Sequence, residues 1–258
     1  MLELIKTRKS VRTFDGRSLS QEDIKKLVDY AETITNPYGI PVKFVFLDAA
    51  EHGLSSPVIA GEHLYVAGKI AKVPHCEEAF GYAFEKLVLY AWSLGIGTTW
   101  IGGTMKRELF EKAAAVEDGE IMPIVSPLGF PAEEKAERDV KLRAAVHGDE
   151  RMDPSELFFD RDFSTPLGSS DYDDALEAVR WSPSAVNKQP YRIVKDGNAF
   201  HFYLKHASAL RGGAWDVQKI DMGIALYHFM TIAGGTCSIA DPQIATDEDT
   251  EYIATVTL

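Results

Sequence analysis

The sequences RKSVR, at residues 8–12, and SPSAVNKQP, at residues 182–190, decide how this chain is interpreted. More than half of the chain separates them. The sequence around them passes twice through the same order of predicted helices and strands. We therefore expect two similar structural halves, each of which carries one of the two segments.

Two predicted helices give the clearest sign of this repeat. Apolar side chains recur at helical spacing in each half, and the second stripe lies 148 positions after the first, since 172 − 24 is 148. The first stripe follows Ser20 and Asp23, which have the spacing of a capping box. The stripes are Ile24, Leu27, Val28 and Ala31, and Tyr172, Ala175, Leu176 and Val179.

The other predicted elements keep one order in both halves. After a polar loop, each half continues with a strand, a strongly apolar helix that ends at glycine, and a further strand. In the second half, the first strand forms a hairpin with the next one. The predicted strands are 41–46, 121–125, 190–194, 200–204 and 252–258, and the predicted apolar helices are 80–94 and 222–233. We expect residues 1–150 and 151–258 to form two intimately packed halves.

The composition indicates a protein that binds neither nucleic acid nor a membrane. A chain of 258 residues with 45% hydrophobic residues can build a sizeable core. Its formal net charge of −12 would repel nucleic acids and anionic lipid surfaces. The most apolar stretch, 79–94, is too short to span a bilayer, and the N-terminus does not resemble a signal peptide. The two cysteines lie outside any metal-binding spacing, so we expect a cytoplasmic protein without a metal.

The two quoted segments carry groups that suit a phosphorylated ligand. Arg8, Ser10 and Arg12 project to the same side of an extended chain, so two guanidinium groups and one hydroxyl can meet one phosphate. A basic segment that faces solvent is the alternative. The loop at residues 182–190 supplies several side chains that donate and accept hydrogen bonds. It lies between a predicted helix and a predicted strand, where ligand contacts concentrate.

Four motifs, in their order, give the chain a resemblance that covers nearly its whole length. The first is R-x-S-x-R-x-F at residues 8–14, and the second is P-S-x-x-N-x-Q-P with a following aromatic residue at 183–191. The third is an apolar helix that runs into LGIGTTWIGG at 94–103. The fourth is PLGFP at 127–131, with basic residues beyond it. With these motifs the chain resembles the flavin-dependent nitroreductase superfamily.

The resemblance implies a nitroreductase-like α+β fold, with mixed, mainly antiparallel sheets flanked by helices. In this superfamily the phosphate-binding start comes from one subunit and the Ser-x-x-Asn loop from its partner. Here the loop at 35–41 lacks the Ser-x-x-Asn-x-Gln set. The positions where Arg8 and Ser10 would repeat hold Leu157 and Phe159 at an offset of 149, or Glu156 and Phe158 at an offset of 148, and neither pair can bind phosphate. Each half has kept what the other lost. This resembles the single-chain, pseudo-dimeric branch, and it implies an internally duplicated monomer with one flavin site.

The resemblance also implies which residues hold FMN. We expect the phosphate at the N-terminal segment, with support from Lys135 or Arg138, and the second loop at the ring or ribityl chain. The backbone N–H groups of Gly102 and Gly103 are expected near N5 of the ring, and no side chain is expected to be catalytic because the flavin performs the chemistry. The full expected set is Arg8, Lys9, Ser10, Arg12, Trp100, Ile101, Gly102, Gly103, Lys135, Arg138, Ser182, Pro183, Ser184, Asn187 and Gln189.

The function implied is an FMN-dependent oxidoreductase that passes hydride from NADH or NADPH to a small, flat acceptor such as a nitroaromatic or a quinone. Two alternatives stay open: a flavin protein of this fold with other chemistry, such as dehalogenation or flavin destruction, and a non-catalytic flavin reservoir or interaction module. Other sites find less support. GIGTTW at 95–100 lacks the third glycine of a dinucleotide fingerprint, HCEE at 75–78 has no second ligand cluster, and no Gly-x-Ser-x-Gly sequence indicates a serine hydrolase.

Overall fold

In the computed structural model, which describes residues 1–210 and 212–258, the chain divides into two units. One unit consists of residues 7–147, and the other of residues 1–6 together with 148–258. The first six residues thus group with the second half of the chain, whereas the sequence placed them in the first. None of the described helices is long and apolar enough to cross a membrane.

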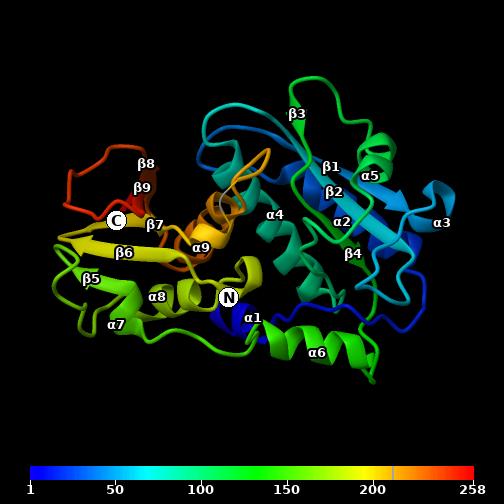
Figure 1. Cartoon of the computed structure of the whole chain (residues 1–258), viewed down its shortest axis with the longest axis horizontal. Coiled ribbons are helices and arrows are strands. Elements are labelled where there is room, and N and C mark those ends of the chain that lie inside the picture. Colours follow the sequence, from blue (N-terminus) through cyan, green and yellow to red (C-terminus); the bar gives the residue numbers. More distant parts are fainter. Residues whose placement is uncertain (211) are drawn as a thin grey trace. The chain divides into compact units, whose positions relative to one another are not determined.

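The unit of residues 7–147 is built on a four-stranded sheet with β2 at its centre (Figure 1). β2 pairs antiparallel with β1 and, on its other edge, with the short strands β3 and β4. The strands are β1 (Val42–Asp48), β2 (Leu64–Ala71), β3 (Glu120–Ile121) and β4 (Val125–Leu128). The helices are α2 (Gln21–Thr33), α3 (Ala49–His52), α4 (Cys76–Ser93), α5 (Arg107–Ala113) and α6 (Glu137–Ala145).

Local sequence explains how the helices of this unit begin and pack. The Ser20 side chain accepts a hydrogen bond from the Asp23 N–H and so caps α2. The apolar helix α4 is buried on most of its surface. Gly68 on β2 permits close packing of this helix, because a Cβ at Gly68 would lie 2.7 Å from the Phe80 ring. After α4, the chain turns at Gly95, whose φ is 76°, and enters the segment that holds the expected Trp-Ile-Gly-Gly turn.

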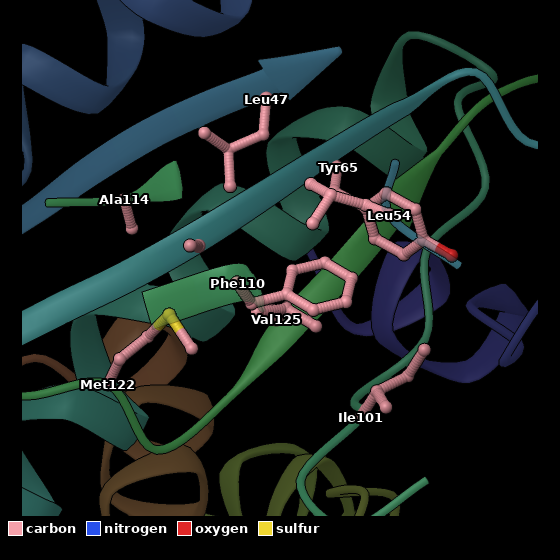
Figure 2. Close-up of a cluster of buried hydrophobic side chains, with 9 residues drawn as sticks. Leu47, Leu54, Tyr65, Ile101, Phe110, Ala114, Met122 and Val125 are labelled. Carbon is pink, nitrogen blue, oxygen red and sulfur yellow. The ribbon is translucent and has the colours of Figure 1, made fainter. Parts of the chain in front are cut away.

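A hydrophobic cluster includes Ile101 of that turn and holds it in place (Figure 2). It contains Tyr65 of β2 and Phe110 of α5, whose rings meet edge to face with centroids 5.0 Å apart. Ile101 is 3% exposed and belongs to the same cluster. The apolar core of this unit therefore anchors residues 100–103. The whole cluster is Leu47, Leu54, Tyr65, Ala67, Ile101, Phe110, Ala114, Met122 and Val125.

The second unit contains a five-stranded sheet in the order β5-β6-β7-β9-β8. β5 and β6 pair parallel, and all other neighbours pair antiparallel. α9 packs on one face of the sheet, where Phe229 contacts Phe200 and Phe202. The strands are β5 (Phe158–Asp160), β6 (Tyr191–Asp196), β7 (Ala199–Lys205), β8 (Thr236–Ser238) and β9 (Thr250–Thr257). The α-helices are α1 (Leu2–Thr7), α7 (Pro154–Leu157), α8 (Asp173–Arg180) and α9 (Val217–Ala233), and short 3-10 helices are Ala185–Asn187 and Ser208–Leu210.

Both units contain the same series of elements with the same pairing. The series is α2-β1-β2-α4-β4 in one unit and α8-β6-β7-α9-β9 in the other. In each, the first two strands pair antiparallel, and the last strand pairs antiparallel with the second. The predicted α+β class is confirmed. The predicted strand at 121–125 is wrong in extent, because residues 122–124 separate β3 from β4, and no strand was predicted where β2 lies.

Candidate functional site

The basic segment at residues 8–14 lies in an extended conformation against two glycine-containing segments of its own unit. The Val11 N–H donates to the Thr98 carbonyl at 2.8 Å, and Ser10 pairs with Thr98 in a parallel bridge. A Cβ at Gly97 would lie 2.7 Å from the Val11 side chain, and one at Gly129 would lie 2.8 Å from the Phe14 ring. These two glycines therefore let the basic segment lie flat.

Arg8 and Arg12 lie within electrostatic range of a third arginine, Arg143 on α6. Burial lowers the pKa of both Arg8 and Arg12, and repulsion by the charge of Arg143 lowers both further. Arg12 donates to Asp139 of α6 at 3.4 Å, and the Thr13 hydroxyl lies 3.4 Å from the same carboxylate. Asp139 thus holds the start of α6 to the basic segment. The result is a cluster of three cations that is partly neutralised by a buried acid.

Arg8 faces a second buried acid, Glu85 of α4. The Nε of Arg8 lies 3.9 Å from Oε1 of Glu85, and the two side chains are 6% and 0% exposed. The indole N–H of Trp100 donates to Oε2 of Glu85 at 3.2 Å. One carboxylate therefore links the basic segment to the turn that begins at Trp100.

Two buried polar atoms beside this cluster lack partners within the described part of the chain. They are the Nε of Arg8 and the hydroxyl of Thr98. A buried donor without a partner costs free energy and is unusual in a folded protein. A phosphate carries the acceptor oxygens that groups of this kind need. The residues present therefore fit the phosphate end of FMN.

The turn at residues 100–103 is fixed by backbone and side-chain bonds. The Ile101 N–H and carbonyl both bond to Val125, at 2.9 and 3.0 Å. Arg107 donates to the carbonyl of Gly102 at 2.6 Å and to the carbonyl of Met122 at 2.5 Å. Ile101 thus uses its backbone within the fold. Over residues 1–210 and 212–258, no partner accepts from the N–H groups of Gly102 and Gly103.

The structure separates the expected phosphate residues into buried and exposed ones. Arg8, Ser10 and Arg12 are at least partly buried in the segment described above, whereas Lys9, Lys135 and Arg138 are exposed. Arg143 was missed by the sequence reasoning. The sequence around Arg143 carries little indication of a binding role, because its helix has no periodic apolar stripe that would show which side packs inward. The packing of α6 places Arg143 within electrostatic range of Arg8 and Arg12.

The loop at residues 182–190 lies in the other unit and has a strained backbone. Val186, Asn187 and Gln189 have φ values of 45°, 56° and 48°, in the left-handed region. This region is unfavourable for a β-branched residue such as Val186. Such strain is common at functional sites and persists only where surrounding contacts hold it.

Buried polar groups hold this loop in place. Both carboxylate oxygens of Asp221, on α9, accept from the Ala185 N–H, at 3.1 and 3.0 Å. The Ser184 hydroxyl accepts from the Gln189 N–H at 2.8 Å. Burial raises the pKa of Asp221 well above its usual value, and the bond from Ala185 opposes this shift.

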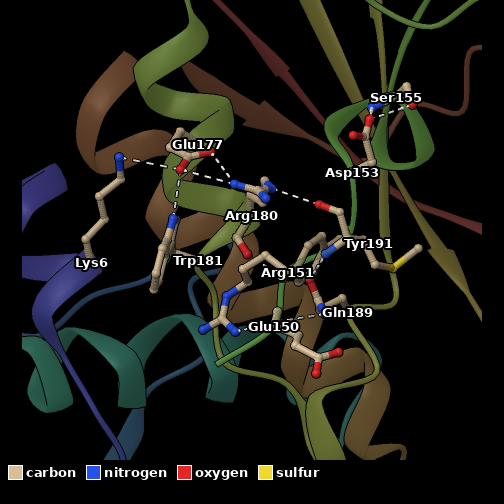
Figure 3. Close-up of polar contacts among 11 residues, drawn as sticks. Lys6, Glu150, Arg151, Asp153, Ser155, Glu177, Arg180, Trp181, Gln189 and Tyr191 are labelled. Carbon is tan, nitrogen blue, oxygen red and sulfur yellow. Dashed lines mark hydrogen bonds and ion pairs between the residues drawn. The ribbon is translucent and has the colours of Figure 1, made fainter. Parts of the chain in front are cut away.

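Several residues expected to contact the flavin make bonds within their own unit. Gln189 is buried and accepts from the Met152 N–H at 2.9 Å (Figure 3), and Asn187 donates to the Glu150 carbonyl at 3.1 Å. Ser182 is fully buried, with its hydroxyl 2.9 Å from Nδ1 of His228. These contacts give the three side chains a structural role within their own unit. Pro183 and Ser184 are partly exposed. Contact of any of these five residues with a flavin stays a prediction.

A polar network supports the start of this loop (Figure 3). Glu177 of α8 accepts from the Trp181 indole N–H at 2.8 Å and from Arg180 at 3.3 Å, and it lies 3.4 Å from the Lys6 ammonium. Arg180 also donates to the Met152 carbonyl at 2.8 Å. Residues 150–152 and the end of α8 therefore form one bonded frame for the loop.

The fold is that of a nitroreductase. A crystal structure titled as a putative nitroreductase from Thermotoga maritima matches 100% of this chain and 93% of that chain, with a TM-score of 0.60 and 18% sequence identity. The family model described as "Putative TM nitroreductase" matches residues 1–233. The chain therefore belongs to this nitroreductase family.

Two archaeal relatives share part of the chain. A protein of Methanothermobacter thermautotrophicus is 27% identical over 168 residues, which are 57% of this chain and 85% of that protein. One of Archaeoglobus fulgidus is 29% identical over 152 residues, which are 52% of this chain and 87% of that protein. Both are named "Putative NADH dehydrogenase/NAD(P)H nitroreductase".

Proposed function

We propose that this protein is an FMN-dependent oxidoreductase that takes hydride from NADH or NADPH and passes it to a small, flat acceptor such as a nitroaromatic or a quinone. Membership of the nitroreductase family supports this proposal, as do the names of the two archaeal relatives. Bound FMN would supply the redox chemistry, while the protein supplies binding and electrostatics.

The observation that carries the proposal is the arginine cluster. Arg8, Arg12 and Arg143 lie within electrostatic reach of one another, and the Nε of Arg8 is buried without a partner in the described part of the chain. Guanidinium groups bind phosphates through paired, charge-assisted bonds. We assign the phosphate of FMN to these three residues, with the Ser10 and Thr98 hydroxyls as further donors.

The turn at residues 100–103 is proposed to act at the edge of the flavin ring. The core anchors it through Ile101, and Arg107 fixes the Gly102 carbonyl. The N–H groups of Gly102 and Gly103 would then donate to the ring edge without a rearrangement of the turn. The strained loop at residues 184–189 is proposed to bind the remainder of the flavin. We further propose one FMN and one nicotinamide-dependent activity per monomeric chain.

The experiment that tests this proposal is a spectroscopic titration in two steps. FMN is added to the purified protein and bound flavin is measured; NADH or NADPH is then added without oxygen. Bleaching of the visible absorbance of the bound flavin, followed by its return on addition of a quinone, is the expected result. Binding without bleaching by either reductant would favour a flavin reservoir or a different chemistry, and absence of binding would refute the proposal.

A further inference from the structure

Glu85 occupies an unusual position for an acid. It lies in the apolar helix α4 and is fully buried, yet it faces a guanidinium group that the proposed function assigns to a phosphate. Its Oε2 accepts from the Trp100 indole N–H at 3.2 Å, while its Oε1 lies 3.9 Å from the Nε of Arg8. The first contact is a hydrogen bond, and the second is beyond hydrogen-bond distance.

The pair of Arg8 and Glu85 is therefore incomplete. A guanidinium has five N–H donors, and a well-seated carboxylate accepts two of them side by side. Here the buried Nε of Arg8 finds no acceptor among the residues that the structure describes. Burial of both side chains removes water as a substitute. Glu85 thus compensates the charge of Arg8 without satisfying its Nε donor.

The charges of the cluster show what an incoming anion would meet. Three cations, Arg8, Arg12 and Arg143, face two buried acids, Glu85 and Asp139. Asp139 makes a direct bond to Arg12 and anchors α6. Glu85 contacts the Nε of Arg8 at the longer distance of 3.9 Å. Because this Nε has no hydrogen-bond partner among the described residues, an anion that replaces Glu85 there breaks no hydrogen bond at this atom.

We propose that Glu85 is a built-in counter-ion for Arg8. Glu85 holds the guanidinium of Arg8 in place when no phosphate is bound, and a bound phosphate replaces Glu85 as the partner of Arg8. The inference rests on the proposed assignment of Arg8 to a phosphate group. Without the carboxylate, Arg8 is a buried and unpaired charge, which destabilises a fold strongly. With it, the site folds in the absence of ligand, and phosphate binding is weaker than the three arginines alone would give.

The test compares Glu85→Gln with wild type in buffers with and without inorganic phosphate. Glutamine keeps an oxygen that accepts from the Trp100 indole, and it removes the charge. In phosphate-free buffer we expect a lower melting temperature for Glu85→Gln. Inorganic phosphate should then raise its melting temperature more than that of wild type, with a phosphate affinity at least about tenfold higher because one negative charge has left the site. Sodium chloride at the same ionic strength should not reproduce this rescue.

Glu78→Gln is the matched control. Glu78 is also buried on α4, and its Oε1 lies 3.7 Å from Nδ1 of His75. This variant should show the phosphate response of wild type, whatever its stability. An equal phosphate response in Glu85→Gln and wild type would overturn the proposal and make Glu85 a purely structural acid. If Glu85→Gln does not fold without phosphate, refolding yield against phosphate concentration replaces the melting curve, and a yield that phosphate does not raise is again contradictory.

A second measurement separates this inference from the proposed function. The ratio of FMN affinity to riboflavin affinity reports the phosphate alone, and it should rise in Glu85→Gln. If wild type binds inorganic phosphate but neither flavin, the proposed function fails while the counter-ion role stands. If wild type prefers FMN and Glu85→Gln shows the same preference, the counter-ion role fails while the proposed function stands.

Discussion

Arg8 is the residue on which the proposed phosphate site depends most. It is almost fully buried, it faces one acid at a long distance, and it has an unsatisfied donor within the described chain. Arg12 differs, because Asp139 already bonds it. A phosphate therefore gains more from Arg8 than from Arg12.

The first prediction concerns both arginines. Arg8→Ala combined with Arg12→Ala should abolish FMN retention during purification, because two charge-assisted partners of the phosphate are lost. Riboflavin binding, which needs no phosphate contact, should change much less. Equilibrium dialysis with each flavin measures both quantities. Retention of FMN by the double variant at wild-type affinity would refute the phosphate assignment.

The second prediction separates Arg143 from its neighbour Arg138. Arg143→Ala should weaken FMN binding about 10- to 100-fold, as expected for loss of about 1.5–3 kcal/mol from a charged hydrogen bond. Arg138→Ala is the control, since Arg138 is exposed on the same helix. A fluorescence titration of FMN measures both variants. The reverse order of effects would return the phosphate to Arg138, as the sequence suggested.

The third prediction uses the raised pKa of Asp221. The Asp221 carboxyl stays protonated to a higher pH in the folded state than in the unfolded state. Its contribution to the free energy of unfolding therefore falls as the pH rises above the ordinary carboxyl pKa. Asp221→Asn removes this dependence. The free energy of unfolding of Asp221→Asn, relative to wild type, should therefore increase between about pH 4 and pH 7. Urea unfolding at several pH values measures it, and a constant difference would contradict the assigned shift.

The residues of the candidate site were only partly predictable. Arg8, Ser10 and Arg12 were found because their alternation and chemistry are local features of the sequence. Glu85, Asp139 and Arg143 were not, because their roles arise where separate helices pack against the basic segment. Gln189 and Asn187 were identified as hydrogen-bonding residues, but sequence could not tell that they bond to residues 150–152.

At the scale of elements, the glycines beside the basic segment control where it lies. Gly97 and Gly129 each leave room for one side chain of that segment, Val11 and Phe14. Both glycines lie within the motifs at residues 94–103 and 127–131 that resemble the superfamily, and the packing supplies the physical reason for them. The helices α4 and α9 were predicted because their sequences are strongly apolar. The strand β2 and the helix α6 were not predicted, because no pattern in the sequence marked the strand and the helix has only weak apolar periodicity.

The fourth prediction tests this packing. Gly97→Ala should destabilise the protein by about 1–3 kcal/mol, because the new methyl group overlaps Val11 and must displace the basic segment. FMN affinity should fall with it. Gly168→Ala is the control, since a Cβ there meets nothing within 4 Å. Chemical unfolding and FMN titration of both variants check the prediction, and an unchanged Gly97→Ala would contradict it.

At the scale of the whole chain, the two units repeat one series of elements with one pairing pattern. The basic segment occurs in one unit, and the Ser-Pro-Ser loop in the other. We interpret this repeat as an internal duplication, and the assignment of each segment to part of a flavin site stays a proposal. The fold class followed from local patterns that occur twice, whereas the grouping of residues 1–6 with the second unit depends on long-range packing that no local pattern encodes.

The most direct test of the central claim is the stoichiometry and selectivity of flavin binding. FMN and riboflavin are titrated separately into the purified chain, whose mass in solution is measured by light scattering. We predict a monomer that binds about one FMN per chain and prefers FMN to riboflavin at least about tenfold, because the arginine cluster binds the phosphate. Equal affinity for the two flavins, or two FMN per chain, would contradict the account.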